Sequence, residues 1–200
     1  MPFMNRSVVN RTAMLLCAMA AVQAVLVATF HAAFLPPLIT PLSGATPLGW
    51  VLAVIVAALY VWFSVRALPT IGRYLWNVSA FKLTGLAIAL PASILEEVFF
   101  RQYVMNALIA QPLVIQIAAS GLSFGIAHAI WGIRGGRRAV VGAVGATTLM
   151  GAALEVVFIV SNRSILPCVL GHFLITVLLE PWLLYAYIER ATTNRRLSVL

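Results

Sequence analysis

The chain has 200 residues, of which 62% are hydrophobic, and its mean hydropathy is +1.02. Only 9% of the residues are charged, against about 25% in an ordinary soluble domain, so the composition excludes a soluble globular fold and a disordered chain. The net charge of +8 does not indicate nucleic-acid binding, because that function needs a hydrated basic face that so apolar a chain does not offer.

The first half of the chain contains two apolar segments long enough to cross a membrane as helices, each of which needs about 20 residues. They are residues 13–35 and 48–65, separated at 36–44 by a stretch with three prolines and a glycine that predicts a loop. The first segment also resembles a cleaved signal peptide, but its apolar run is longer than the usual stretch of about 7–15 residues. Residues 66–82 carry three bases and several aromatics, which is typical of a connection at the membrane surface.

The second half of the chain contains four more apolar segments, divided by a proline, a basic glycine-rich loop and a polar turn. They are predicted as spans at residues 83–109, 113–131, 139–160 and 165–187. The prediction is therefore an all-α fold: a polytopic transmembrane helical bundle of about six spans. Residues 1–200 form a single integral membrane domain, with N-terminal spans in 13–65 and site-bearing spans in 83–187.

The basic residues support this count of spans. Alternating the loops between the two sides of the membrane puts eleven bases on one side and Arg163 on the other, with Arg101 inside a span. The positive-inside rule makes the eleven-base side cytoplasmic, with both termini there. The eleven are Arg6, Arg11, Arg66, Arg73, Lys82, Arg134, Arg137, Arg138, Arg190, Arg195 and Arg196.

The third span contains three charged residues, Glu96, Glu97 and Arg101. A charge at the centre of a span costs about 2.5–3.5 kcal/mol on insertion scales, so such residues usually face the bundle interior and have a function. Glu97 and Arg101 are four residues apart and are expected to pair on one helical face. Glu96 points about 140° away from Arg101, which leaves it available as a base. The alternative is an ion-paired element that only holds helices together.

Two of the three histidines also lie within predicted spans. His128 follows Phe124 by one turn in the fourth span, and His172 precedes Thr176 by one turn and Glu180 by two turns in the sixth. Either histidine alone is typical of a helix contact. Both histidines lie in spans, as do the only two adjacent carboxylates of the chain, Glu96 and Glu97. A joint chemical role is therefore favoured over two separate helix contacts.

One glutamate and two histidines can hydrolyse a peptide bond inside a membrane. A glutamate in a low-dielectric cavity has a raised pKa and can act as a general base toward water. One histidine can pass the proton to the leaving amine, and the other can stabilise the oxyanion together with a neighbouring hydroxyl or amide. Glu96, His128 and His172 could instead hold a zinc ion. Without the H-E-x-x-H spacing this remains the less favoured interpretation, and no cofactor is expected.

At these residues the sequence resembles the CPBP (CAAX protease and bacteriocin-processing) family of intramembrane endopeptidases, which includes the Ras-converting CAAX proteases and the bacterial Abi proteins. The E-E-x-x-x-R motif of that family matches residues 96–101 and its F-x-x-x-H motif matches residues 124–128. Its H-x-x-x-N/D motif matches residues 172–176 except at the last position, where this chain has Thr176.

The resemblance implies that Glu96 activates water, that His128 assists proton transfer and that His172 and the residue at Thr176 stabilise the oxyanion. Glu97 and Arg101 would orient the site. The threonine at position 176 leaves three outcomes open: a slower enzyme, an altered geometry, or a family member without activity. The alternatives to a peptidase are an inactive immunity or scaffold protein of the same family and a proton-coupled transporter.

The partners expected are membrane lipids and a hydrophobic or membrane-anchored peptide, with no nucleic acid. Glu180 is expected either to orient His172 through water or to end a helix at the interface. Glu155 is expected to be a buried partner of an arginine or a polar helix contact rather than a catalytic residue. His31 is expected at the membrane interface.

Counting from the span ends places the three site residues at different depths: Glu96 near mid-membrane, His172 in the outer half and His128 toward the cytoplasm. They can meet only if a span end is displaced by a turn or more, or if a helix is kinked, for which Pro91 is an obvious place.

Overall fold

The computed structural model of the chain describes residues 6–29, 44–72, 75–76 and 80–197. His31 and nearly all of the predicted loop at 36–44 lie outside these residues. The described residues form helices and no strand. In chain order the elements are α1 (Arg6–Thr29), α4 (Pro47–Ala67), α5 (Pro69–Gly72), α6 (Ala80–Glu97), the π-helix η1 (Val98–Val104), α7 (Met105–Ala107), α8 (Leu113–Ala127), the 3₁₀ helix η2 (His128–Gly135), α9 (Arg137–Val160) and α10 (Leu166–Leu197).

The prediction of an all-α bundle with six spans is confirmed. Six helical stretches are long and apolar enough to cross a membrane, so the protein is an integral membrane protein. The first helix begins at Arg6, seven residues before the predicted start at residue 13, because the helix continues through polar residues that precede the apolar run. The six stretches are Arg6–Thr29, Pro47–Ala67, Lys82–Ala107, Leu113–Ile130, Arg137–Val160 and Leu166–Ala186.

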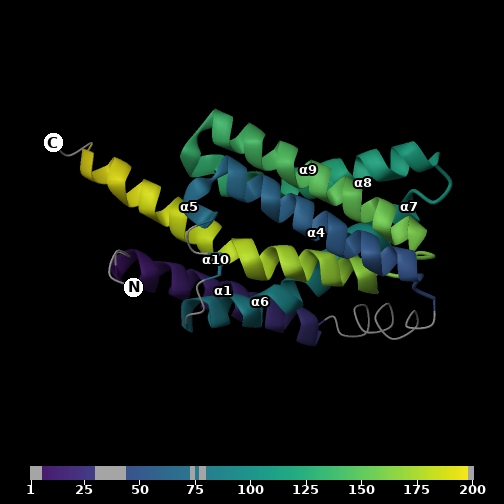
Figure 1. Ribbon diagram of the computed structural model, residues 1–200, viewed down its shortest axis with the longest axis horizontal. Helices are drawn as coiled ribbons and strands as arrows, with labels where there is room; N and C mark the ends of the chain where they lie inside the picture. Colours follow the sequence, from purple (N-terminus) through teal and green to yellow (C-terminus); the bar gives the residue numbers. More distant parts are fainter. Residues whose placement is uncertain (1–5, 30–43, 73–74, 77–79, 198–200) are drawn as a thin grey trace.

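Helix α10 lies at the centre of the bundle and packs against α1, α4, α6 and α9 (Figure 1). Its apolar window is 61% buried, whereas that of α1 is 11% buried and presents most of its side chains outward. A helix surrounded by other helices can hold polar side chains away from lipid. The position of α10 therefore makes it the element best placed to contribute polar residues to a site.

Glycines, among them Gly121 and Gly125, allow α8 and α9 to pack closely as an antiparallel pair. A Cβ atom at Gly125 would lie 2.0 Å from Oγ1 of Thr148 and 2.7 Å from the carbonyl oxygen of Val144. The close approach fixes the position of α8, which ends at the residue before His128.

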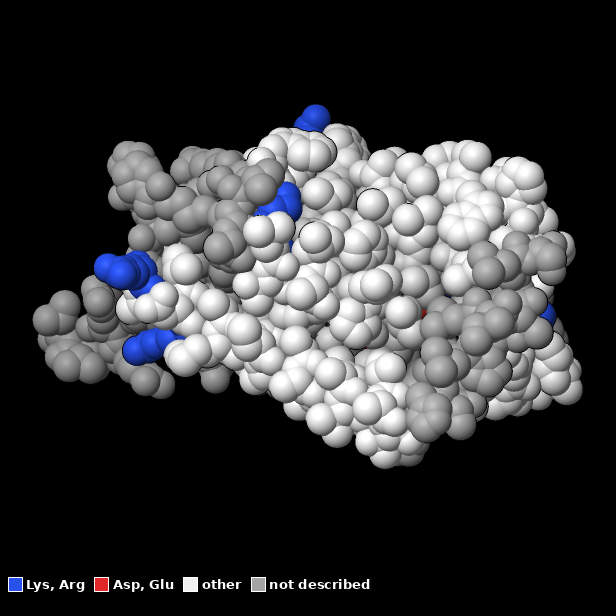
Figure 2. All heavy atoms as spheres, turned by 90° about the horizontal axis from the view of Figure 1, so that it is seen from below, with Lys and Arg blue, Asp and Glu red and all other residues white. Residues whose placement is uncertain are grey.

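The two ends of the bundle differ in charge. The start of α1, the end of α10 and the α4–α5–α6 connection lie at one end, and the α7–α8 and α9–α10 connections lie at the other (Figure 1). In Figure 2 most of the visible basic side chains lie toward the first end, and only a trace of acidic side chain is visible. Of the four acidic residues of the spans, Glu97 and Glu155 are buried and Glu96 and Glu180 are partly exposed.

Candidate active site

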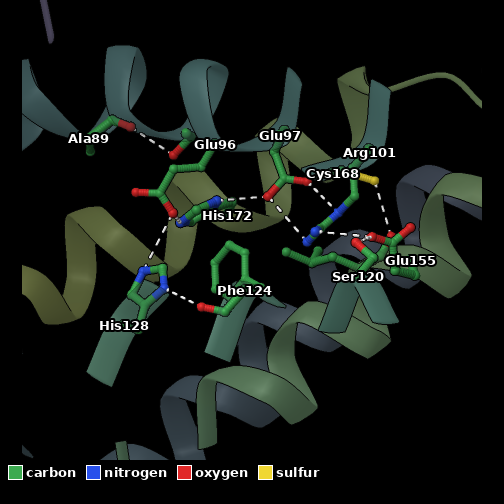
Figure 3. A network of polar contacts seen from close by, with 12 residues as sticks. Ala89, Glu96, Glu97, Arg101, Ser120, Phe124, His128, Glu155, Cys168 and His172 are labelled. Carbon is green, nitrogen blue, oxygen red and sulfur yellow. Dashed lines mark hydrogen bonds and ion pairs between the residues drawn. The ribbon is translucent and has the colours of Figure 1, made fainter. Parts of the chain in front are cut away.

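The charged and histidine side chains of the third, fourth and sixth spans converge at one place in the bundle (Figure 3). Glu96 and Glu97 are the last two residues of α6, His128 begins η2 directly after α8, and His172 lies in α10. The predicted difference in depth among Glu96, His128 and His172 is therefore wrong.

The reason for this error is that the spans are not regular α-helices throughout. The third span changes to a π-helix at Val98, seven residues after Pro91, and the fourth changes to a 3₁₀ helix at His128. These segments have a different rise per residue from an α-helix, and the depths had been counted along regular, straight helices.

Glu96 forms the open side of this cluster. Its Oε2 atom lies 3.4 Å from Nε2 of His128 and 3.8 Å from Nε2 of His172. The side chain of Glu96 is 31% exposed and that of His128 is 17% exposed, while His172 is buried. Among the described residues no hydrogen bond reaches Oε2 of Glu96, although that atom is itself buried. Oε2 therefore faces the two imidazoles, while the exposed part of the side chain can meet water or a substrate.

Glu97 forms the closed side of the cluster, directly next to Glu96 in the chain. Its Oε2 atom lies 2.9 Å from Nε of Arg101, and NH1 of the same arginine lies 3.1 Å from Oε1 of Glu155. The hydroxyl of Ser120 donates a hydrogen bond to Glu155. The side chains of Glu97, Arg101 and Glu155 have no exposed surface. The predicted pairing of Glu97 with Arg101, and of Glu155 with an arginine, is confirmed.

The sequence analysis missed two contacts of this closed side. Nδ1 of His172 lies 2.8 Å from Oε1 of Glu97, so this histidine touches both sides of the cluster. Ser120 was also missed, although it lies one turn before Phe124 and two turns before His128. A polar residue on that stripe of an apolar span was the available signal.

The hydrogen bonds made by the two histidines define their tautomers. Nδ1 of His128 lies 2.8 Å from the carbonyl oxygen of Phe124, which can only accept, so Nδ1 carries the hydrogen. Nδ1 of His172 likewise donates to Glu97, a carboxylate paired with Arg101. In their neutral forms both rings consequently present the lone pair of Nε2 toward Glu96. A proton can pass between the carboxylate and either ring.

The ring of Phe124 lies at the centre of these groups. It stacks on His128 with 4.3 Å between ring centroids, and it meets His172 edge to face at 5.6 Å. The guanidinium carbon of Arg101 lies 5.3 Å from its centroid. Because a buried ring in contact with three polar groups has little freedom to move, Phe124 holds both imidazoles in place.

Thr176 and Glu180 continue from His172 along α10 at intervals of one turn. Thr176 is buried, and within the part of the chain that the structure describes its hydroxyl makes no hydrogen bond. Glu180 is only partly exposed and lies one turn beyond Thr176. The alternative that Glu180 ends a helix at the interface is wrong, because α10 continues to Leu197.

Glu96, His128 and His172 were also the residues considered for a zinc ion. In the described ranges, no group of three or more His, Cys, Asp or Glu side chains is arranged to hold a metal. The three residues come from three separate helical stretches, so no short motif fixes their mutual distances.

Comparison with known proteins identifies the family. A family model described as type II CAAX prenyl endopeptidase Rce1-like matches residues 78–178, which is half of the chain and contains all three motifs. Searches of the curated proteins and of the solved structures give no match. The match favours neither a scaffold nor a transporter. The chain belongs to the Rce1-like family of type II CAAX prenyl endopeptidases, which are intramembrane proteases.

Proposed function

We propose that this chain is an active intramembrane endopeptidase that hydrolyses a peptide bond in a membrane-associated or hydrophobic substrate. The observation that carries the proposal is the position of Glu96. Its unbonded carboxylate oxygen faces Nε2 of both histidines on the open side of the cluster. A base beside one histidine that can take up a proton and a second that can donate to the oxyanion, in a site that is partly open, is an arrangement suited to water activation.

In the proposed reaction Glu96 removes a proton from water, and the hydroxide formed attacks the carbonyl carbon of the substrate. His172, protonated on both nitrogens and stabilised by Glu97, donates from Nε2 to the oxyanion, and the Thr176 hydroxyl donates a second hydrogen bond. The proton held by Glu96 passes to Nε2 of His128, 3.4 Å away, and then to the leaving nitrogen. The C–N bond breaks, and a carboxylic acid and an amine are released.

Thr176 supports this reaction with a single hydrogen-bond donor. An amide at the same position would reach one bond further into the site. Losing one oxyanion donor can cost about 10²–10³ in rate. We therefore expect this enzyme to be slower than one with asparagine at position 176, so Thr176→Asn should raise kcat.

The distribution of charge supports an orientation with both termini in the cytoplasm. The exposed bases Arg137 and Arg138 lie where η2 meets α9, at the end of the bundle that also holds the start of α1 and the end of α10 (Figure 1). The excess of basic residues at that end is typical of a cytoplasmic face, where they contact anionic headgroups.

Cleavage by the purified protein in liposomes tests this proposal. The substrates are a fluorogenic peptide prenylated near its carboxyl end and an unprenylated peptide with a hydrophobic leader. We expect Glu96→Ala, His128→Ala and His172→Ala each to lose cleavage while the protein remains inserted. Glu189→Ala, which removes a carboxylate far along α10, is the matched control. Unchanged cleavage by Glu96→Ala would contradict the proposal.

The proposed reaction uses no metal ion, and this point has its own test. We expect 1,10-phenanthroline to leave the cleavage rate unchanged. Loss of the rate with the chelator, followed by recovery on adding Zn²⁺, would instead assign Glu96, His128 and His172 as zinc ligands.

A further inference from the structure

Glu180 is a carboxyl group within a membrane span that the proposed reaction does not use. It lies inside the apolar window of α10 and is only partly exposed. In the described part of the chain its carboxyl forms neither a hydrogen bond nor an ion pair. A carboxyl group without partners is costly at that depth, so its retention calls for a function.

Two contacts between α6 and α10 define the space beside Glu180. At one end, Gly85 lies so close to Pro181 that a Cβ atom on the glycine would be 2.3 Å from the proline ring. At the other end, Glu97 is bonded to His172. Between these contacts the two helices carry small or polar buried residues: Ala89, Ala92 and Ser93 on α6 and Thr176 on α10. Bulky buried residues, Ile88 on α6 and Ile175 and Leu179 on α10, occupy the rest of this stretch. The polar path from Glu180 toward the site therefore runs along α10 through Thr176, one turn before it.

The side chain of Glu180 extends toward the site. In an α-helix the Cα–Cβ bond tilts toward the N-terminus, so a long side chain covers the turn that precedes it. The turn preceding Glu180 carries Thr176, and the turn before that carries His172.

Burial within an apolar span favours the neutral form of Glu180, because a charged carboxylate is costly there. Among the described residues, two titratable groups act on it: a protonated His172 on α10 favours the charged form, and an ionised Glu96 on α6 disfavours it. Two carboxylates close together in a membrane span would be strongly disfavoured. A neutral carboxylic acid can donate one hydrogen bond.

We propose that Glu180 is a positioning residue of the same site: its neutral carboxyl donates, through one water molecule, to the hydroxyl oxygen of Thr176. With its oxygen lone pair occupied in this way, the threonine turns its proton toward the substrate and acts as the second oxyanion donor. Glu180 thus supplies the orientation that a hydroxyl, which rotates freely, does not have by itself. This inference rests on the proposed function of the site.

A double-mutant cycle on cleavage in liposomes tests the inference. The variants are Thr176→Val, Glu180→Leu and the two combined, with Glu180→Gln as the conservative variant. We expect Glu180→Leu to lower kcat about tenfold, the effect of one hydrogen bond, with KM changed less than about twofold. In the Thr176→Val background the same change should have no further effect. Glu180→Gln, a neutral donor of similar length, should recover most of the rate.

Three results would overturn the inference. The first is a fold loss in kcat of the double variant equal to the product of the losses of Thr176→Val and Glu180→Leu. The others are a rate for Glu180→Gln as low as that of Glu180→Leu, and full activity of Glu180→Leu. Glu180→Met replaces Glu180→Leu if the latter does not fold. Glu96→Gln is measured in the same preparation. If Glu96→Gln cleaves normally, the proposed function itself fails. If Glu96→Gln is inactive but the losses in kcat caused by the changes at positions 176 and 180 are independent of each other, only the role of Glu180 is rejected.

Discussion

Glu96 and Glu97 are consecutive in the chain but have opposite surroundings. Glu97 is fully buried and makes short contacts of 2.8–2.9 Å with Arg101 and His172, whereas Glu96 is partly exposed and makes longer contacts of 3.4 and 3.8 Å with the two histidines. A buried carboxylate with close partners is held in one position by them. A partly exposed carboxylate that faces two imidazoles can exchange a proton. The comparison thus separates a structural half of the cluster from a reactive half.

The difference arises from the geometry of one helical turn. Consecutive residues of an α-helix point about 100° apart, so the end of α6 directs Glu97 to Arg101 and Glu96 to the two histidines. His172 links the two halves, because Nδ1 contacts Glu97 and Nε2 faces Glu96. The closed side therefore orients a ring that the open side uses.

The largest effect is expected from Arg101→Met, which breaks the closed side. The change leaves Glu155 buried without a cation and Glu97 with His172 as its one remaining described partner, and removing one partner of a buried ion pair costs about 3–5 kcal/mol. We expect a marked fall in the unfolding temperature in detergent, measured by the fluorescence of the intrinsic tryptophans. Arg66→Met, on a base that lies over Trp62, is the control. An equal fall in both variants would contradict the closed-side assignment.

The two histidines are expected to differ in kind. His128→Ala should lower kcat by about 10²–10³ with little change in unfolding temperature, because its side chain is partly exposed and bonds only a backbone carbonyl of its own helix. His172→Ala should lower both quantities, since it also removes the partner of Glu97. Equal unfolding temperatures of the two variants would contradict the structural role of His172 as a partner of Glu97.

Gly125→Val perturbs the open side through the backbone. The added side chain would collide with Thr148 and the carbonyl oxygen of Val144, so α8 must shift and carry His128 with it. We expect a destabilisation of about 1–3 kcal/mol together with a lower kcat. Gly142→Val is the matched control, because a Cβ atom there meets nothing within 4 Å. Equal activity of the two variants would refute the importance of this helix contact.

The smallest effect is expected from Ser120→Ala on the closed side. The change removes one hydrogen bond to Glu155, which keeps its contact with Arg101, so the cost should be about 1 kcal/mol. Cleavage should stay at the level of the unmodified protein, measured on the same liposomes. A loss of activity larger than the loss of stability would place Ser120 on the reactive half instead.

The sequence predicts much of this molecule where a simple periodicity applies. Six apolar runs of sufficient length predict the six spans, and the spacing of four residues predicts the pair of Glu97 and Arg101. The roles of Glu96, His128, His172 and Thr176 remain predictions that the variants above address.

The sequence predicts that Glu96, His128 and His172 act together, but the geometry by which they converge could not be predicted from it. This geometry depends on the π-helical turn after Glu97 and on the change to a 3₁₀ helix at His128, which alter the rise and direction of two spans. Contacts between residues distant in the chain, such as that of Glu97 with His172 across 75 positions, carry no local signal. They result from the packing of α10 between α6 and α9.

The central claim is that Glu96 reacts while Glu97 supports, and the pair Glu96→Gln and Glu97→Gln tests it most directly. Both changes keep the shape of the side chain and remove one negative charge. For each variant, the rate of peptide cleavage in liposomes is measured together with the unfolding temperature. Glu96→Gln should lose at least about 10³-fold in rate and unfold like the unmodified protein, whereas Glu97→Gln should unfold at a clearly lower temperature. Cleavage by Glu96→Gln at more than about a tenth of the normal rate would contradict the claim.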